Sequence, residues 1–284
     1  PIHERGIGYV FQDGRLFPHM NVRDNLLYGY SRAERPTLAG EFDRVASILG
    51  IDRLLERAPG SLSGGESQRV AVGRAFLGAR KLLLMDEPLA SLDAARRREV
   101  LPYIDALANE IELPIVYVSH SIDEVCRLAD HIVVMDEGRV RASGEPQSVL
   151  TRTDLPVIAD EEACTVIRAS VSDYDQAYDL TRVAISGGEM VLAGRYETNR
   201  DRVRVRVRAN DVSLCLTQPR DSTILNVLPA VVEEIATRDS AQAMIRLAVG
   251  SDKVLARITR RSAQALALQP GIEVFAQIKS VAVR

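Results

Sequence analysis

The hydrophobic pattern changes character near the middle of the chain. Up to about residue 150, short apolar runs alternate with longer segments in which apolar side chains recur at helical spacing. Beyond Thr151 this spacing fades, and short alternating runs follow one another between turns. The first half therefore predicts an α/β fold with parallel strands, and the second half predicts an all-β module, a small barrel.

The apolar runs of the first half predict buried strands at residues 7–11, 82–85, 114–118 and 132–135. Asn21, with Asp24 three residues on, predicts the start of one helix, and Asp93 predicts the start of another. The polar composition and helical spacing of residues 31–60 predict an inserted helical region. Glu137 and Gly138 predict a tight turn after the strand at 132–135.

Ser63 and Glu66 form an S-x-x-E capping box, which predicts a helix that begins at Gly64. The same pattern recurs at residues 121–124. Gly64 and Gly65 occupy the first turn, where glycine weakens a helix unless close approach is required. The free N–H groups and the positive end of the helix dipole favour an anion, so we expect an anion to bind at this helix start.

Polar side chains follow three of the predicted strands. Gln12 follows the first, Asp86 and Glu87 follow the second, and His120 follows the third. Open α/β sheets bind ligands at the carboxyl ends of their strands. Asp86 suits Mg²⁺, and Glu87 is placed to orient and deprotonate an attacking water. Taken singly, each of these residues is equally explained as a solvated or packing residue at a strand end.

Composition narrows the function classes. With 46% hydrophobic and 26% charged residues, the 284-residue chain can form one large core or two ordinary ones. A net charge of −3 argues against a nucleic-acid partner. No apolar run approaches the roughly 18 residues of a membrane helix. Cys126, Cys164 and Cys215 are far apart in sequence and lack ligand spacing, which predicts buried thiols in a reducing cytosol.

Taken together, these residues resemble the nucleotide-binding subunit of ATP-binding cassette (ABC) transporters over residues 6–150. Five motifs occur in the family's order: Gln12 at the Q-loop, Leu62-Ser63-Gly64-Gly65-Glu66 at the signature sequence, Leu82 to Asp86 at the Walker B strand with Glu87 as the catalytic glutamate, Ser91-Leu92-Asp93 at the D-loop, and His120 as the switch histidine.

The resemblance implies a homodimer that sandwiches two ATP molecules with Mg²⁺. It implies the following roles: Glu87, His120 and Gln12 in catalysis, Ser63, Gly64, Gly65, Glu66 and Asp93 in ATP binding, and Asp86 and Gln12 at the metal. The signature residues would contact the ATP held by the other subunit. Residues 16–60 would include the surface that receives the membrane partner.

The family's P-loop sequence, Gly-x-x-x-x-Gly-Lys-Ser/Thr, does not occur in the 284 residues. In the family it lies upstream of the Q-loop, whereas here a predicted strand begins soon after Pro1. We therefore expect that the chain is the partial ABC domain of a longer protein. We also expect the residues as given to hydrolyse ATP poorly or not at all.

The second half predicts eight strands, at residues 183–185, 190–192, 203–207, 212–216, 231–235, 243–247, 254–258 and 274–278. The alternation of Val and Arg from Val203 to Arg208 suggests a basic patch. Its strict period of two favours a strand with one solvated face over a nucleic-acid site.

Residues 221–228 and 276–281 resemble the oligonucleotide-fold (OB-like) regulatory domain of importer ATPases, the TOBE/Mop type. The implied oxyanion ligands are Ser222, Thr223, Asn226, Lys279 and Ser280. Leu225 stands where that family commonly has Arg, so a barrel that only dimerises is the alternative. The predicted domains are the ABC domain at 1–152, a β-rich connection at 153–220 and the TOBE/Mop-like domain at 221–284.

The segments Phe11-Gln12-Asp13 and Leu101-Pro102-Tyr103-Ile104 also resemble the molybdate subgroup of these importers. The resemblance implies an ATP-hydrolysing subunit that energises molybdate import, peripheral on the cytoplasmic face of the inner membrane. Its implied partners are a second copy, integral-membrane permease subunits and, indirectly, a periplasmic oxyanion-binding protein, with molybdate as a regulatory ligand. Three alternatives stay open: another cargo such as tungstate or sulfate, a non-catalytic oxyanion sensor, and a soluble ABC protein of translation or DNA repair. The last usually carries a second cassette or a long coiled coil, and the sequence has neither.

Overall fold

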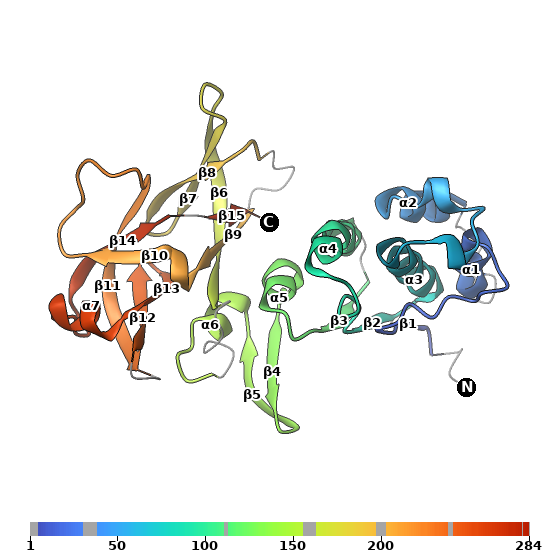
Figure 1. The fold of residues 1–284 in the computed structure, drawn as a ribbon, viewed down its shortest axis with the longest axis horizontal. Coiled ribbons are helices and arrows are strands. Elements are labelled where there is room, and N and C mark those ends of the chain that lie inside the picture. The colour runs from blue at the N-terminus through green and yellow to red at the C-terminus, as the bar shows by residue number, and fades with distance from the viewer. Residues whose placement is uncertain are drawn as a thin grey trace. The chain divides into compact units, whose positions relative to one another are not determined.

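A computed structural model describes residues 5–30, 39–110, 113–155, 163–196, 203–237, 241–279 and 281–283. The chain divides into two compact units, Pro1–Glu124 and Val125–Arg284 (Figure 1). The first contains the parallel strands and most of the helices, whereas the second is dominated by antiparallel strands. The predicted order, α/β followed by all-β, is confirmed.

In the first unit, the described residues form a three-stranded parallel sheet in the order β1 (Ile7–Val10), β2 (Leu82–Asp86), β3 (Ile115–Val118). The accompanying helices are α1 (Val22–Tyr30), α2 (Ala39–Ile48), α3 (Gly64–Gly78) and α4 (Ala94–Glu110). Figure 1 shows them on one side of the sheet. Burial agrees, because along β1 the side chain of Val10 is buried whereas Ile7 and Tyr9 are exposed.

The helices contact the sheet closely because glycines lie at the points of contact. A Cβ on Gly8 of β1 would come within 2.2 Å of the carbonyl oxygen of Ala75 on α3. Gly73 of α3 gives the same close approach to α1, since a Cβ there would lie 2.8 Å from Leu26. Leu26 is fully buried. These glycines set the spacing on which the edge of the sheet depends.

The predicted strand at residues 132–135 is β4 (Ile132–Asp136), and it forms a hairpin with β5 (Arg139–Gly144). The predicted turn is confirmed: Glu137 has φ 48° and Gly138 has φ 73°, as a two-residue hairpin requires. The expectation that this strand joins the parallel sheet is not met within the described residues, where β4 pairs with β5 alone.

The second unit contains two five-stranded sheets in the described part of the chain, in the orders β15-β9-β6-β7-β8 and β10-β14-β11-β12-β13. Their strands are β6 (Cys164–Asp175), β7 (Leu180–Ile185), β8 (Gly188–Ala193), β9 (Val203–Arg208), β10 (Val212–Cys215), β11 (Asn226–Thr237), β12 (Gln242–Val249), β13 (Asp252–Thr259), β14 (Glu273–Ile278) and β15 (Ala282–Val283). The accompanying helices are α5 (Ile122–Leu128), which begins in the first unit, α6 (Pro146–Leu150) and α7 (Arg260–Ala265).

The two sheets share one hydrophobic core, to which Ile167 and Val205 contribute from one sheet and Ile245 and Val254 from the other. All eight predicted strands are present, and β6 and β15 are additional strands that the sequence did not predict. The sequence placed a domain boundary between residues 220 and 221. Strands from the two sides of this position pair with one another, β10 with β14 and β9 with β15. One core stabilises the whole β region.

Candidate functional site

The parallel register brings the predicted chemical groups to one edge of the sheet. Val10 lies opposite Met85, and Asp86 lies opposite Val118, so the residues that follow β1, β2 and β3 emerge side by side. The Tyr9 hydroxyl donates a hydrogen bond of 2.9 Å to Oδ2 of Asp86, and this bond raises the pKa of Tyr9. The carboxylate that ends β2 is thus oriented by the neighbouring strand.

Glu87 and His120 are in contact at this edge. Oε1 of Glu87 lies 3.4 Å from Nδ1 of His120, with the two side chains 37% and 68% exposed. Glu87 has φ 44°, and its N–H donates to the carbonyl of Val118 at 3.0 Å. A non-glycine residue in this region is strained, and such strain concentrates at functional sites. The structure therefore brings together two residues that the sequence singled out separately, each for its own motif.

Gln12 and Ser91 are also in contact, although they are 79 residues apart in sequence. The Ser91 hydroxyl donates to the backbone carbonyl of Gln12 at 3.3 Å. This bond joins the segment resembling the Q-loop to the segment resembling the D-loop. The side chain of Gln12 is exposed.

The predicted capping box at the start of α3 is confirmed in both directions. The N–H of Ser63 donates to the Glu66 carboxylate at 2.7 Å, and the N–H of Glu66 donates to Oγ of Ser63 at 3.3 Å. The bond from the Ser63 backbone lowers the pKa of Glu66. Ser63 is exposed, so the beginning of α3 is open to a ligand.

The start of α3 packs against the start of α4. A Cβ on Gly64 would lie 3.3 Å from Leu92, and a Cβ on Gly65 would lie 3.3 Å from Val100. Asp93 caps α4 by accepting bonds from the N–H groups of Ala95 (3.0 Å) and Arg96 (2.9 Å), which lowers its pKa. Close helix packing is therefore a structural reason for the two glycines, beside the anion approach that the sequence suggested.

Glu124 is a residue whose role the sequence did not reveal. Its backbone N–H reaches Oγ of Ser121 at 3.5 Å, but its carboxylate does not complete the predicted second capping box. The carboxylate instead accepts bonds from the hydroxyls of Tyr117 (2.8 Å) and Ser119 (2.7 Å) and lies 3.5 Å from Arg97.

Burial explains why Glu124 departs from the predicted box. Its side chain is only 3% exposed, and a buried carboxylate needs several donors. Burial and the Glu124 charge raise the pKa of Tyr117 far above its ordinary range. The Glu124 carboxylate thereby fixes Tyr117 and Ser119, which lead up to His120. An acid one turn into the helix after a strand end was the signal available in the sequence.

The metal ligands predicted from the sequence are Asp86 and Gln12. Both side chains are exposed and carry oxygen donors, which suit Mg²⁺. Among the described residues there is no group of three or more His, Cys, Asp or Glu side chains arranged to hold a metal by themselves. The donor set therefore fits a Mg²⁺ ion that takes its other ligands from phosphate oxygens and water.

The predicted oxyanion residues lie at one end of the second sheet. Asn226, which begins β11, pairs with Ile278, which ends β14, so Ser222 and Thr223 approach the same end as Lys279. These three side chains are exposed. Ser280 lies outside the described residues.

Asn226 differs from the other predicted oxyanion residues because it is buried. Its amide accepts a bond from the N–H of Val191 at 2.6 Å and donates to the Val191 carbonyl at 3.0 Å. The side chain therefore ties β11 to β8, and hence one sheet to the other.

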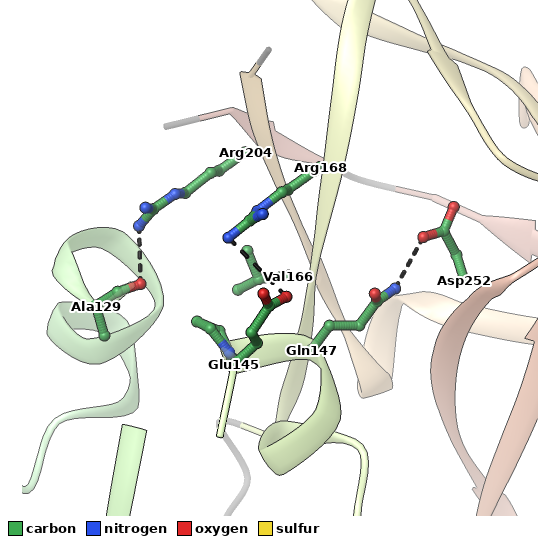
Figure 2. Close-up of a pocket in the computed structure, with 8 residues that line it drawn as sticks. Ala129, Glu145, Gln147, Val166, Arg168, Arg204 and Asp252 are labelled. Atoms are coloured by element: carbon green, nitrogen blue, oxygen red, sulfur yellow. Dashed lines mark hydrogen bonds and ion pairs between the residues drawn. The ribbon is translucent and has the colours of Figure 1, made fainter. Parts of the chain in front are cut away.

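The second unit has a pocket of about 210 Å³ whose lining includes none of the predicted site residues (Figure 2). Its lining includes Arg168 and Arg204, which lie directly opposite each other on β6 and β9. Arg204 donates to the carbonyl of Ala129 at 2.9 Å, and Gln147 donates to Asp252 at 3.0 Å. The polar groups in Figure 2 are thus engaged with one another.

The fold and the edge of the first sheet define an ABC-type ATPase domain, followed by a TOBE domain. Residues 1–90 match the ABC transporter family, and residues 222–284 match the TOBE domain family. No described helix is long and apolar enough to cross a membrane.

Relatives similar over nearly the whole chain include three proteins named as molybdenum import ATP-binding protein. ModC 1 of Azotobacter vinelandii is 49% identical over 99% of this chain and 78% of its own length. ModC of Aromatoleum aromaticum is 48% identical over 99% of this chain and 75% of its own length. ModC of Pseudomonas aeruginosa is 48% identical over 99% of this chain and 79% of its own length. The chain belongs to the family of molybdenum import ATP-binding proteins, ModC.

Proposed function

We propose that this chain is the ATP-hydrolysing subunit that energises molybdate import through an ABC transporter, with Glu87 as the general base. The observation that carries the proposal is the contact of Glu87 with His120, 3.4 Å apart, beside the strand that ends in Asp86. Glu87 is exposed enough to receive a water molecule. His120 is placed to orient the Glu87 carboxylate and to contact the phosphate under attack.

In this proposal Asp86 and Gln12 hold Mg²⁺, which neutralises phosphate charge when it is bound. The bond from Tyr9 keeps the Asp86 carboxylate at the edge of the sheet. The bond between Ser91 and Gln12 couples the two segments that border the phosphate site. These residues bind and orient, and the proton of the attacking water passes to Glu87.

The signature residues Ser63 to Glu66, together with Asp93, serve the ATP of a second copy in a homodimer. The start of α3 supports this role, since it presents N–H groups and the positive end of a 15-residue helix. The capping box fixes the first turn of that helix before any nucleotide arrives.

Residues 16–60 receive the integral-membrane permease. Phe17 packs on Tyr28 with ring centroids 4.3 Å apart, and the guanidinium of Arg74 lies 4.9 Å from the centre of the Phe17 ring. Aromatic side chains fixed in this way suit an apolar helix of a partner. Through the permease the chain is held at the cytoplasmic face of the membrane, and a periplasmic oxyanion-binding protein acts only indirectly. The net charge of −3 argues against a nucleic-acid partner.

The test is the substitution Glu87→Gln in the native polypeptide assembled with its permease. We expect ATP hydrolysis and molybdate uptake to fall by about 10²–10⁴-fold, the usual contribution of a general base, while ATP binding is retained. Asp136→Asn is the matched control, because Asp136 is a partly exposed acid paired with Arg141 and lies outside the residues assigned to the site or to the permease. Hydrolysis at the wild-type rate in Glu87→Gln would contradict the assignment of the base.

The convergence of Ser222, Thr223 and Lys279 at one sheet end supports a second role, oxyanion sensing by the TOBE domain. Calorimetric titration of the chain with molybdate, tungstate and sulfate tests it and ranks the cargo candidates. Lys279→Ala should weaken oxyanion binding, whereas Lys81→Ala, an exposed lysine of the first unit, should not. Absence of heat with all three ions would leave dimerisation as the role of this domain.

A further inference from the structure

Two of the three cysteines meet inside the second unit. Cys126 lies on α5 and Cys164 begins β6, and their Sγ atoms are 2.7 Å apart. The side chains are buried, with exposed fractions of 2% and 1%. The sequence predicted separate buried thiols, and folding converts them into a pair because α5 packs beside the start of β6.

The separation of the two sulfurs is shorter than an ordinary contact. Non-bonded carbon atoms settle about 3.5–4.0 Å apart, and sulfur is larger than carbon. A disulfide bond is about 2.05 Å long. At 2.7 Å the Cys126 and Cys164 sulfurs are nearer to bonding distance than to a non-bonded contact, so little movement is needed to join them.

Hydrogen bonds that do not involve the sulfurs hold the end of α5 beside the start of β6. The guanidinium of Arg204 donates to the carbonyl of Ala129 at 2.9 Å, just after α5 (Figure 2). It also donates to the carbonyl of Arg127 at 3.3 Å and pairs with Asp130. Arg204 lies on β9, which pairs with β6 in a register that places Cys164 opposite Arg208. The end of α5 is therefore fixed on the sheet that carries Cys164.

We propose that Cys126 and Cys164 form a reversible intramolecular disulfide, a redox modification site of this chain, with hydrogen peroxide as the oxidant. One thiolate attacks a peroxide oxygen and breaks the O–O bond. It becomes a sulfenic acid, while the departing hydroxide takes up the thiol proton as water. The second thiol attacks the sulfenic sulfur and releases the second water, so two electrons pass from the thiols to peroxide.

A small oxidant suits this site because neither sulfur is exposed to a bulky disulfide reagent. The bond would join the last turns of α5 to the first residue of β6 and close a loop between positions 38 apart in sequence. Disulfides in reducing compartments are usually transient and redox-sensing, which fits a reversible link rather than a permanent one. The inference is independent of the proposed ATPase role.

The test treats the folded chain with hydrogen peroxide, alkylates the remaining thiols under denaturing conditions and measures the intact mass and the peptide map. We expect loss of two thiols, a mass lower by two hydrogens, a linked peptide pair containing Cys126 and Cys164, and full reversal by dithiothreitol. Thermal unfolding should shift to higher temperature after oxidation and return on reduction.

Cys126→Ala and Cys164→Ala should each abolish the linked pair, whereas Cys215→Ala should leave it unchanged. Cys215 also calibrates the reaction in the wild type, because its side chain is partly exposed. Oxidation of Cys215 without loss of the other two thiols would overturn the proposal. So would separate sulfinic acids, or a disulfide that includes Cys215. These outcomes are read on the wild-type chain and do not depend on how well the variants fold.

Discussion

Both the edge of the parallel sheet and the junction of the two β-sheets contain polar residues that the sequence predicted as ligand-binding. The two regions differ in how far those side chains are exposed and hydrogen-bonded. At the sheet edge, His120 is 68% exposed and has its described contact with Glu87 at 3.4 Å. At the junction, Asn226 is buried, and its amide both accepts from and donates to the backbone of Val191. An exposed, loosely held group is available to a ligand, whereas a buried one with satisfied hydrogen bonds stabilises the fold.

The same distinction applies within the first unit. Glu87 and Glu124 are both acids beside the end of a strand, yet Glu87 is open to solvent and Glu124 is enclosed by hydroxyl groups and Arg97. We therefore expect substitutions of the enclosed residues to lower stability and substitutions of the open ones to lower activity. The following predictions test the stability side of that separation, from the most enclosed residue to the most open.

Glu124→Ala should have the largest effect on folding. It removes the acceptor of Tyr117 and Ser119 and leaves Arg97 beside an empty space, so we expect the free energy of unfolding to fall by about 3 kcal/mol. Urea denaturation followed by circular dichroism measures it. Glu110→Ala, which removes an exposed acid paired with Arg44, is the control and should cost below about 1 kcal/mol. Equal losses in the two variants would show that Glu124 behaves as a surface acid.

Asn226→Ala should have an intermediate effect. It leaves the N–H and carbonyl of Val191 without their side-chain partner between the two sheets, so we expect a loss of about 2 kcal/mol by thermal unfolding. Asn226→Asp should lose at least as much, because it buries a carboxylate that has one donor and faces the carbonyl of Val191. Lys279→Ala removes an exposed charge and should change stability by about 0.5 kcal/mol at most. The comparison fails if Asn226→Ala is as stable as the wild type.

Glu66→Gln should have the smallest effect, and the effect should depend on pH. The pKa of Glu66 is lower in the folded chain, so its carboxylate contributes stability above the unfolded pKa of about 4.3 and loses that contribution as pH falls through the folded pKa. Because Glu66 is partly exposed, we expect a difference of about 0.5 kcal/mol at pH 7. Denaturation of both proteins from pH 7 to pH 3 should show the two curves converging. A constant difference across this range would assign the effect to packing instead.

The sequence predicted those features that depend on local chemistry. Ser63 and Glu66 specify the start of α3 because their side chains bond to each other's backbone N–H groups. Glu137 and Gly138 specify their turn because both adopt the positive φ that it requires. Motif order singled out Glu87 and His120 one by one, but not their contact. That contact depends on the register of the strands, which no local pattern contains.

Features that depend on packing between distant segments were missed. Strand β6 escaped prediction because a bulge between Val171 and Asp173 interrupts its alternation and its second half is polar. The arginines of β9 predicted a solvated face, yet Arg206 is buried, since the face it occupies is covered by neighbouring elements. Cys126 and Cys164 likewise became a pair only through the fold. Burial is a property of the assembled core and has no local signature.

The close approach of Gly8 to α3 has a consequence for genetics. Any side chain at position 8 must lift β1 from the helix, and Gln12, four residues further along, moves with the strand. An allele that replaces Gly8 would therefore displace Gln12, the proposed Mg²⁺ ligand, while Gln12 and its neighbours keep their wild-type identity. Mutational screens that assign phenotypes by proximity to nucleotide would overlook it, and a second-site change that shortens the side chain at Ala75 could not rescue it, because the obstructing atom at 2.2 Å belongs to the helix backbone.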